Sequence, residues 1–115
     1  MRYYIIAGEA SGDLHGSNLI KEIKKLDKNS EFRCWGGDLI KEQCGNLVKH
    51  YKDYSYMGFF EVFKNIRKIV NNLSLCKKDI LNFKPDAIIY VDFPGFNMRI
   101  AKWAKSKNFI NHFYI

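Results

Sequence analysis

Two turns contain the residues best suited to chemistry, and the first is the glycine-rich segment 7–16, Ala-Gly-Glu-Ala-Ser-Gly-Asp-Leu-His-Gly. Its small residues let the backbone approach a ligand at a helix N-terminus, where free N–H groups and the helix dipole favour an anion. The segment matches neither the GxGxxG nor the Walker A pattern, and the acids Glu9 and Asp13 would repel a diphosphate. The structural alternative is that Ser11 or Asp13 caps the following helix.

The second turn, residues 90–97, contains an aspartate that could act as a general base. Asp92 directly follows the most apolar run of the chain, and open α/β sheets bind ligands at the carboxyl ends of their strands. Partial desolvation by Phe93 and Phe96 would strengthen this carboxylate as a base. The alternative is a structural role in which Asp92, like Asn97, caps the next helix.

A third feature is an aromatic and basic helix face formed by Phe60, Lys64 and Arg67. Such a face suits the headgroup boundary of an anionic membrane, although a solvated basic face has the same pattern. His15, next to the first turn, could touch a phosphate or only form local hydrogen bonds. No spacing of His, Cys and Asp indicates a metal site, and the three cysteines lack the CxxC pattern, which favours inert, reduced thiols.

These residues are positioned by an alternation of strands and helices. Apolar β-branched runs predict strands, and apolar residues at i, i+3, i+4 and i+7 predict helices. The predicted strands cover residues 2–7, 32–35, 47–48, 86–91 and 109–115. The predicted helices cover residues 14–26, 39–43, 57 to just before Lys84-Pro85, and 97–107. The alternation predicts an α/β fold, a Rossmann-like doubly wound parallel sheet with both turns at its carboxyl edge.

The long helix has the most regular apolar pattern of the chain. Its predicted core-facing stripe consists of Phe59, Val62, Phe63, Ile66, Val70 and Leu73. The pair Asn71-Asn72 is a point where this helix could divide into two.

The composition describes one soluble domain with a basic second half. The 115 residues include 19 Lys and Arg against 12 Asp and Glu, and residues 51–115 hold most of that excess. No apolar run reaches the roughly 18 residues of a membrane span, and the opening run is too short for a signal peptide, so a secreted or spanning protein is not expected. The charge suits an anionic partner, but no recognition motif supports nucleic-acid binding.

Four segments together resemble lipid-A-disaccharide synthase in order and spacing. They are residues 7–16, 57–62 (Met-Gly-Phe-Phe-Glu-Val), 84–86 (Lys-Pro-Asp) and 91–97 (Val-Asp-Phe-Pro-Gly-Phe-Asn). The resemblance covers the whole chain but only the amino-terminal part of the family. It implies a glycosyltransferase of the two-domain B fold, with residues 1–115 as a truncated acceptor-side domain. The carboxyl-terminal donor-binding domain would be missing or supplied by a separate chain.

The resemblance also implies a reaction in lipid A biosynthesis. In it, 2,3-diacylglucosamine passes from its UDP conjugate to the 6-hydroxyl of 2,3-diacylglucosamine 1-phosphate, with inversion, to give the β-1,6 disaccharide. No cofactor is implied. The implied location is the cytoplasm of a Gram-negative bacterium, peripherally bound to the anionic surface of the inner membrane. Because the UDP-sugar would be held mainly by the missing domain, the isolated chain is expected to be inactive.

Individual residues acquire roles only through this resemblance. Asp92 matches the general base that takes the proton of the acceptor hydroxyl, and one base is sufficient for a single inverting displacement. The positions matched to substrate binding are Glu9, Ser11, Gly12, Asp13 and Asn97. The positions matched to membrane contact are Phe59, Phe60, Lys64 and Arg67.

Two other function classes compete with this interpretation. One is a non-catalytic module for a membrane surface or anionic ligand, left from a truncated gene, which would bind vesicles in a salt-dependent way. The other is a dinucleotide-binding oxidoreductase domain, which fits the topology but lacks the glycine fingerprint.

Overall fold

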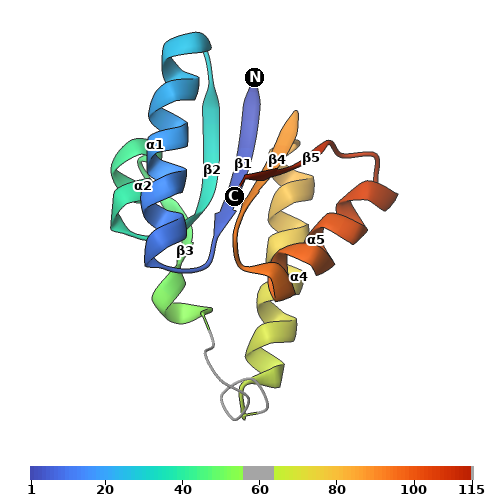
Figure 1. The fold of residues 1–115 in the computed structure, drawn as a ribbon. Helices are drawn as coiled ribbons and strands as arrows, with labels where there is room; N and C mark the ends of the chain where they lie inside the picture. The colour runs from blue at the N-terminus through green and yellow to red at the C-terminus, as the bar shows by residue number, and fades with distance from the viewer. Residues whose placement is uncertain (56–63, 115) are drawn as a thin grey trace.

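The computed structural model describes residues 1–55 and 64–114 and contains one parallel sheet (Figure 1). Its strands are β1 (Arg2–Ala7), β2 (Glu31–Gly36), β3 (Leu47–His50), β4 (Ala87–Val91) and β5 (Asn111–Tyr114). They lie in the order β3-β2-β1-β4-β5, and each neighbouring pair is parallel. β1 therefore lies in the middle of the sheet, with β2 and β3 on one side of it and β4 and β5 on the other.

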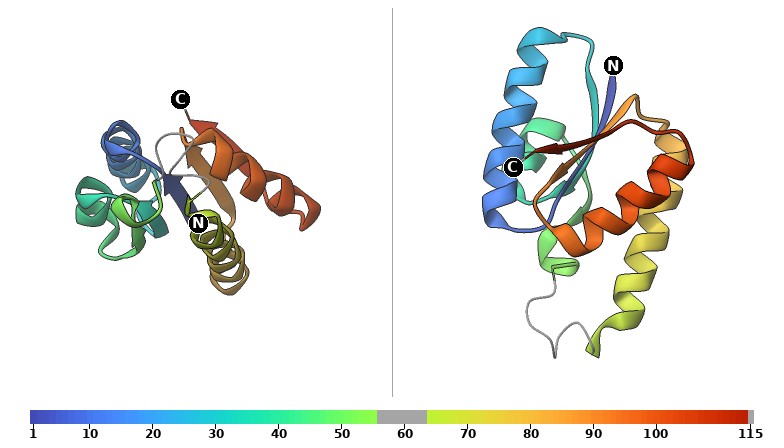
Figure 2. Two further views of the ribbon diagram at one scale, coloured as in Figure 1. Left: turned by 90° about the horizontal axis from the view of Figure 1, so that it is seen from below. Right: turned by 45° about the vertical axis from the view of Figure 1, so that its right-hand side comes forward.

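Helices cover both faces of this sheet. They are α1 (Ala10–Leu26), α2 (Asp38–Cys44), α4 (Ile66–Phe83) and α5 (Pro94–Ser106), and a 3-10 turn, η1 (Tyr51–Asp53), follows β3. Figure 2 shows α1 and α2 on one face and α4 and α5 on the other. The predicted doubly wound, Rossmann-like α/β fold is confirmed.

Alternating side chains of the strands form a separate core on each face, as the two-residue period of a strand requires. Ile5 and Val91 pack under α1 and α2, whereas Ile6 and Tyr90 pack under α4 and α5. Trp35 is the largest fully buried side chain, and its Nε1 donates a hydrogen bond to the Tyr4 hydroxyl, 2.7 Å away. These two cores hold the carboxyl ends of β1 and β4 rigidly beside each other.

The apolar stripe of α4 differs from the predicted one. The buried residues of the helix are Asn72, Cys76 and Ile80. Ile66 and Val70 are instead 58% and 54% exposed, so the predicted stripe was wrong at these positions, although Leu73 does pack against the core. The predicted positions Phe59, Val62 and Phe63 lie outside the described residues.

The predicted break at Asn71-Asn72 was wrong, because α4 continues through both residues. Asn72 is 3% exposed, and its Oδ1 accepts a hydrogen bond from Lys49 Nζ at 2.8 Å. A buried amide with a charged donor is stable inside the fold, so Asn72 can face the core although the predicted stripe did not include it.

Both helices that follow the site turns begin three to four residues earlier than predicted, at Ala10 and Pro94. Proline suits the first position of a helix, where its missing N–H has no intrahelical partner in any case. Because α1 begins at Ala10, Ser11, Gly12 and Asp13 belong to its first turn rather than to a loop.

Candidate functional site

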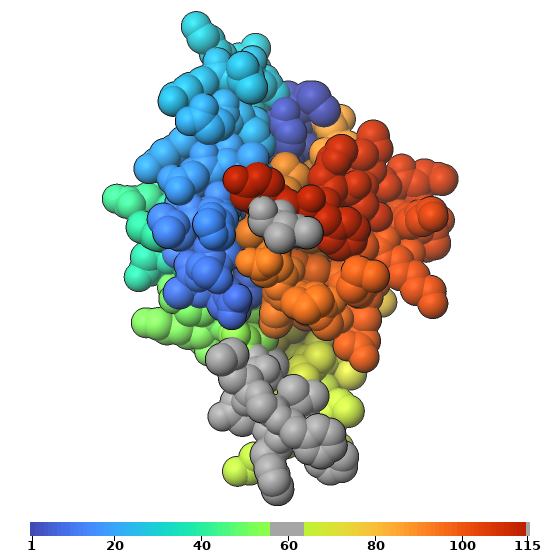
Figure 3. Space-filling model, viewed as in Figure 1, coloured from blue at the N-terminus to red at the C-terminus, as the bar shows by residue number. Residues whose placement is uncertain are grey.

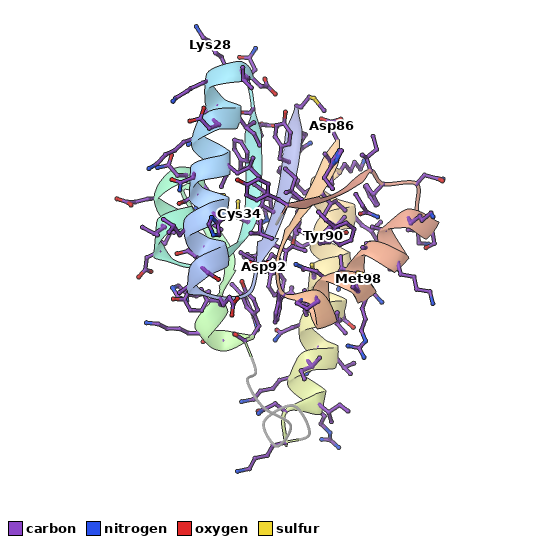
Figure 4. All side chains as sticks on the ribbon, viewed as in Figure 1. Lys28, Cys34, Asp86, Tyr90, Asp92 and Met98 are labelled. Atoms are coloured by element: carbon purple, nitrogen blue, oxygen red, sulfur yellow. The ribbon has the colours of Figure 1, made fainter. Side chains whose placement is uncertain are left out.

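The two sequence turns lie side by side at the carboxyl edge of the sheet. Ala7 pairs with Val91 at the ends of β1 and β4. The buried side chain of Asn97 joins the two strands, because its Nδ2 donates to Ile6 O at 3.3 Å and to Asp92 O at 2.6 Å. Figure 4 shows Asp92 at the end of β4, between the lower end of α1 and the start of α5.

The backbone of Asp92 and Phe93 is left-handed, with φ of +53° and +57°. This conformation is uncommon for residues other than glycine and costs on the order of 1–3 kcal/mol each. The surroundings hold it in place, because Asn97 binds the Asp92 carbonyl oxygen and the Phe93 ring lies against Gly8. A Cβ at Gly8 would come 2.1 Å from Phe93 Cγ. Strained backbone of this kind is concentrated at functional sites.

The Asp92 side chain lies beside an open hollow of about 300 Å³. The hollow is lined by Tyr90, Asp92, Pro94, Asn97, Met98, Phe113 and Tyr114. The predicted desolvation of Asp92 by two phenylalanines was wrong, since Asp92 is exposed. The rings of Phe93 and Phe96 stack on each other 5.3 Å apart and pack with Tyr54 in the core. The carboxylate is thus open to a ligand entering the hollow.

The side-chain oxygen of Asn97 is a buried acceptor without a hydrogen-bond partner among the described residues. The residue is only 1% exposed, yet its Oδ1 has no hydrogen-bond partner among residues 1–55 and 64–114. Buried polar atoms are nearly always paired. Asn97 lines the same hollow as Asp92, but its Oδ1 is covered by protein atoms and lies behind the surface that a ligand in the hollow would meet.

Asp13 lies in the first turn of α1 but caps a different helix. Its Oδ1 accepts hydrogen bonds from the N–H groups of Gly37 at 2.7 Å and Ile40 at 2.9 Å, and its Oδ2 accepts from Leu39 at 3.1 Å. These groups begin α2, so the structural alternative in which Asp13 caps α1 was wrong. With the side chain 4% exposed and both oxygens bound within the protein, the geometry favours a positioning role over direct contact with a substrate.

The other residues of the first turn divide into an exposed pair and a buried glycine. Glu9 and Ser11 are exposed, and Ser11 Oγ donates to Glu9 Oε1 at 3.1 Å, so Ser11 does not cap α1 either. A Cβ on Gly12 would lie 3.4 Å from Val91 O, which shows how closely α1 approaches β4.

A shallow second hollow of about 430 Å³ lies beside the first turn. It is lined by Glu9, Ala10, Ser11, Tyr51, Lys52 and Ser55. The last three come from η1 and the residues after it, and sequence reasoning missed them because this segment has neither a strand nor a helix period. His15 is exposed one turn further along α1.

The start of α4 presents cations and apolar side chains to solvent together. Lys64 and Arg67 are both exposed, next to the exposed Ile66 and Val70. Figure 3 shows this part of the chain, in yellow-green, at the lower end of the molecule, which is also the carboxyl end of the strands in Figure 1. The predicted membrane-contact residues Phe59 and Phe60 lie outside the described residues.

Residues 1–55 and 64–114 contain neither a membrane-spanning helix nor a cluster of metal-ligating side chains. No helix among them is long and apolar enough to span a bilayer. Nor do residues 1–55 and 64–114 bring three or more His, Cys, Asp or Glu side chains together as a metal site.

Comparisons with known proteins agree on one family. A family model described as lipid-A-disaccharide synthetase matches residues 3–115. The lipid-A-disaccharide synthase of Geobacter metallireducens is 39% identical over 104 residues, which are 90% of this chain and 27% of that protein. That of Trichlorobacter lovleyi is 36% identical over 115 residues, 99% of this chain and 30% of that protein. The chain thus spans less than a third of the length of these relatives.

Proposed function

The chain belongs to the lipid-A-disaccharide synthetase family, and on that premise we propose that it forms the acceptor-binding part of a glycosyltransferase of lipid A biosynthesis. The proposed reaction transfers 2,3-diacylglucosamine from its UDP conjugate to the 6-hydroxyl of 2,3-diacylglucosamine 1-phosphate. The remaining family sequence, on the same or a separate chain, would hold the UDP-sugar. The main support is the exposed Asp92 carboxylate, held on a strained turn beside a hollow at the carboxyl edge of the sheet.

In this proposal Asp92 is the general base. Its carboxylate takes the proton of the acceptor hydroxyl while the hydroxyl oxygen attacks the anomeric carbon of the donor. The bond from that carbon to UDP breaks on the opposite side, UDP leaves with the electron pair, and the configuration inverts. A positioned general base contributes about 10²–10⁴-fold to the rate, and a single displacement needs no second carboxylate.

The acceptor side is proposed to consist of Glu9, Ser11, Gly12 and Asn97. Glu9 and Ser11 present exposed polar groups beside the second hollow, and Gly12 lets α1 approach the end of β4. Asn97 lines the hollow beside Asp92 and holds the Asp92 carbonyl oxygen. Asp13 contributes by holding the start of α2 next to this turn.

We also propose that the start of α4 contacts an anionic membrane from the cytoplasmic side, without spanning it. The exposed cations Lys64 and Arg67 lie next to exposed Ile66 and Val70, and the chain as a whole has a net charge of +7. Cations with apolar side chains between them suit the boundary of anionic headgroups. Phe59 and Phe60 are included in this proposed contact on sequence grounds.

A chimera tests the catalytic proposal. This chain would replace the matching 27% of the Geobacter metallireducens relative, and disaccharide formation would be measured with both lipid substrates. Asp92→Asn should lower kcat by about 10²–10⁴-fold with little change in acceptor binding. The control is Asp86→Asn, an exposed carboxylate at the other end of β4, whose amide oxygen can still accept the hydrogen bond from Arg2 N.

Three results would contradict the proposal. An active chimera in which Asp92→Asn and Asp86→Asn behave alike would remove Asp92 as the base. Disaccharide formed by the 115-residue chain alone would contradict the need for a separate donor-binding part. Vesicle binding that Lys64→Glu and Arg67→Glu leave unchanged would contradict the membrane contact.

A non-catalytic binding module is the alternative favoured by the exposed basic and apolar start of α4. It predicts vesicle binding that weakens with salt and an inactive chimera. The catalytic proposal predicts the same salt dependence but an active chimera, so the two are separated by turnover.

A further inference from the structure

Two of the three cysteines belong to the same packed cluster, on the face of the sheet covered by α1 and α2. Cys34 is a fully buried residue of β2, and Cys44 is the half-buried last residue of α2. Leu47 pairs with Cys34 in the β2–β3 ladder, so the short turn after α2 brings Cys44 back beside Cys34. Cys44 and Leu47 both pack against the cluster that contains Cys34. Figure 4 labels Cys34, between β2 and α1.

The two sulfur atoms differ in their surroundings. Cys44 Sγ lies 3.4 Å from Phe32 O, within hydrogen-bond distance, and Lys24 Nζ donates to the carbonyl oxygen of the preceding residue, Gln43. A hydrogen bond from Cys34 lowers the pKa of the Cys44 thiol, with help from a backbone N–H and nearby cations, against the opposing effect of burial. Burial raises the pKa of the Cys34 thiol well above its usual range.

This arrangement is that of an attacking thiol and a resolving thiol. The attacking thiol of such a pair is accessible and has thiolate character, whereas its partner waits in reach as a protonated thiol. Cys44 is the more exposed of the two and its thiol has the lower pKa, so it fits the attacking role, whereas the buried Cys34 fits the resolving role. Cys76 is buried on the opposite face of the sheet, in the other core, and cannot substitute for either.

We propose that Cys44 and Cys34 form a reversible disulfide when the protein meets a peroxide or a small-molecule disulfide. This replaces the interpretation of all three cysteines as inert thiols. It does not depend on the proposed glycosyltransferase function, and its failure would leave that function untouched.

The chemistry balances with either oxidant. With hydrogen peroxide, the Cys44 thiolate attacks one oxygen, the O–O bond breaks, hydroxide leaves and a sulfenic acid forms. The Cys34 sulfur then gives up its proton and attacks the Cys44 sulfur, the S–O bond breaks and water leaves. With oxidised glutathione, Cys44 first forms a mixed disulfide, and Cys34 then displaces the second glutathione thiol. In both cases the two protein sulfurs give up two electrons to the oxidant.

Peptide mapping of the 115-residue chain tests the proposal. The folded chain is treated with oxidised glutathione, unfolded, alkylated and digested. The expected product is a cross-linked peptide containing Cys34 and Cys44, with Cys76 alkylated, and dithiothreitol should reverse it. Cys76→Ser is the matched control and should leave the cross-link unchanged.

Single variants separate the two roles. Cys34→Ser should stop the reaction at a glutathione adduct on Cys44, whereas Cys44→Ser should leave Cys34 unmodified. In the unaltered chain, the rate of Cys44 alkylation by iodoacetamide should reach half its maximum below pH of about 8.5, the value for a free thiol.

Three outcomes would overturn the proposal. They are a cross-link that forms only after unfolding, a cross-link that includes Cys76, and alkylation of Cys34 before Cys44. All three are read from the unaltered chain, so they hold even if a serine variant fails to fold.

Discussion

Replacing Asp13 tests whether its carboxylate stabilises the fold or serves only to bind a substrate. Its carboxylate accepts three backbone hydrogen bonds at the start of α2, from Gly37, Leu39 and Ile40. If Asp13 served only a substrate, its removal would leave the stability of the unliganded chain nearly unchanged. If it positions α2, the loss should appear with no ligand present.

The magnitude of that loss follows from the three donors. Gly37 and Ile40 are buried, so in Asp13→Ala their N–H groups lose a charged acceptor without gaining water. Leu39 is 40% exposed, and its N–H can be hydrated. Hydrogen bonds to charged groups contribute about 1.5–3 kcal/mol each, so the two buried ones predict a loss of about 3–6 kcal/mol. At about 4 °C per kcal/mol for a chain of this size, Tm should fall by about 12–24 °C.

Asp13→Asn should be milder because of how the bonds are divided. Gly37 and Ile40 both donate to Oδ1, and only Leu39 donates to Oδ2. An asparagine can keep the first two bonds through its single carbonyl oxygen, so we expect a loss of about 1–2 kcal/mol. Glu42→Gln is the matched control, because it removes the same charge from an exposed position of α2.

Urea unfolding followed by the fluorescence of the buried Trp35 measures these differences. The urea midpoint should be highest for Glu42→Gln, lower for Asp13→Asn and lowest for Asp13→Ala, with similar m values. A loss below about 1 kcal/mol for Asp13→Ala, with Asp13→Asn indistinguishable from Glu42→Gln, would refute the reasoning. The expected order and size both depend on the cost of leaving buried N–H donors without a charged acceptor.

Three further predictions follow from other contacts. Above about pH 10, stability should fall by about 1.4 kcal/mol per pH unit for each buried tyrosine that ionises only on unfolding, in a thermal-unfolding series against pH. Burial raises the pKa of the three tyrosines concerned, Tyr4, Tyr54 and Tyr90. Gly8→Ala should destabilise by about 1–3 kcal/mol, because its Cβ would meet the Phe93 ring. The control Gly95→Ala, with open space around it, should not lower the stability. Equal Tm values for the two variants in thermal melts would contradict the close contact between Gly8 and Phe93. Asn97→Ala should cost about 1–3 kcal/mol and speed hydrogen exchange around Asp92, whose carbonyl oxygen loses its donor; unchanged exchange would contradict that role.

Local patterns predicted the fold well because each strand is recognisable by itself. The run from Ala87 to Val91 is buried at every position, as a continuous apolar sequence indicates for a parallel strand covered on both faces. Topology then brings the ends of β1 and β4 together, so the proximity of the two turns was also predictable. The placement of Asp92 at this edge needed no knowledge of any side-chain contact.

The parts that sequence could not predict depend on contacts between distant elements. Asp13 lies 24 to 27 residues from the groups it caps, and no local pattern indicates which helix a carboxylate will serve. In α4, the periodicity favoured the apolar Ile66 and Val70, whereas the core accepted Asn72 because Lys49 reaches it from β3. The predicted desolvation of Asp92 was wrong for the same reason, because the Phe93 ring packs against Tyr54 rather than over the carboxylate.

The central position of β1 also determines the order in which the sheet can assemble. β1, α1, β2, α2 and β3 are consecutive, so this half can form while the chain is still being synthesised. The other edge of β1 pairs with β4, and the contact between Arg2 and Asp86 joins residues 84 apart. Contacts so distant in sequence form slowly, and an unpaired strand edge is prone to aggregation until they do. During synthesis, the edge of β1 that later receives β4 therefore stays unpaired, and open to pairing with another chain, until residues 87–91 have been made.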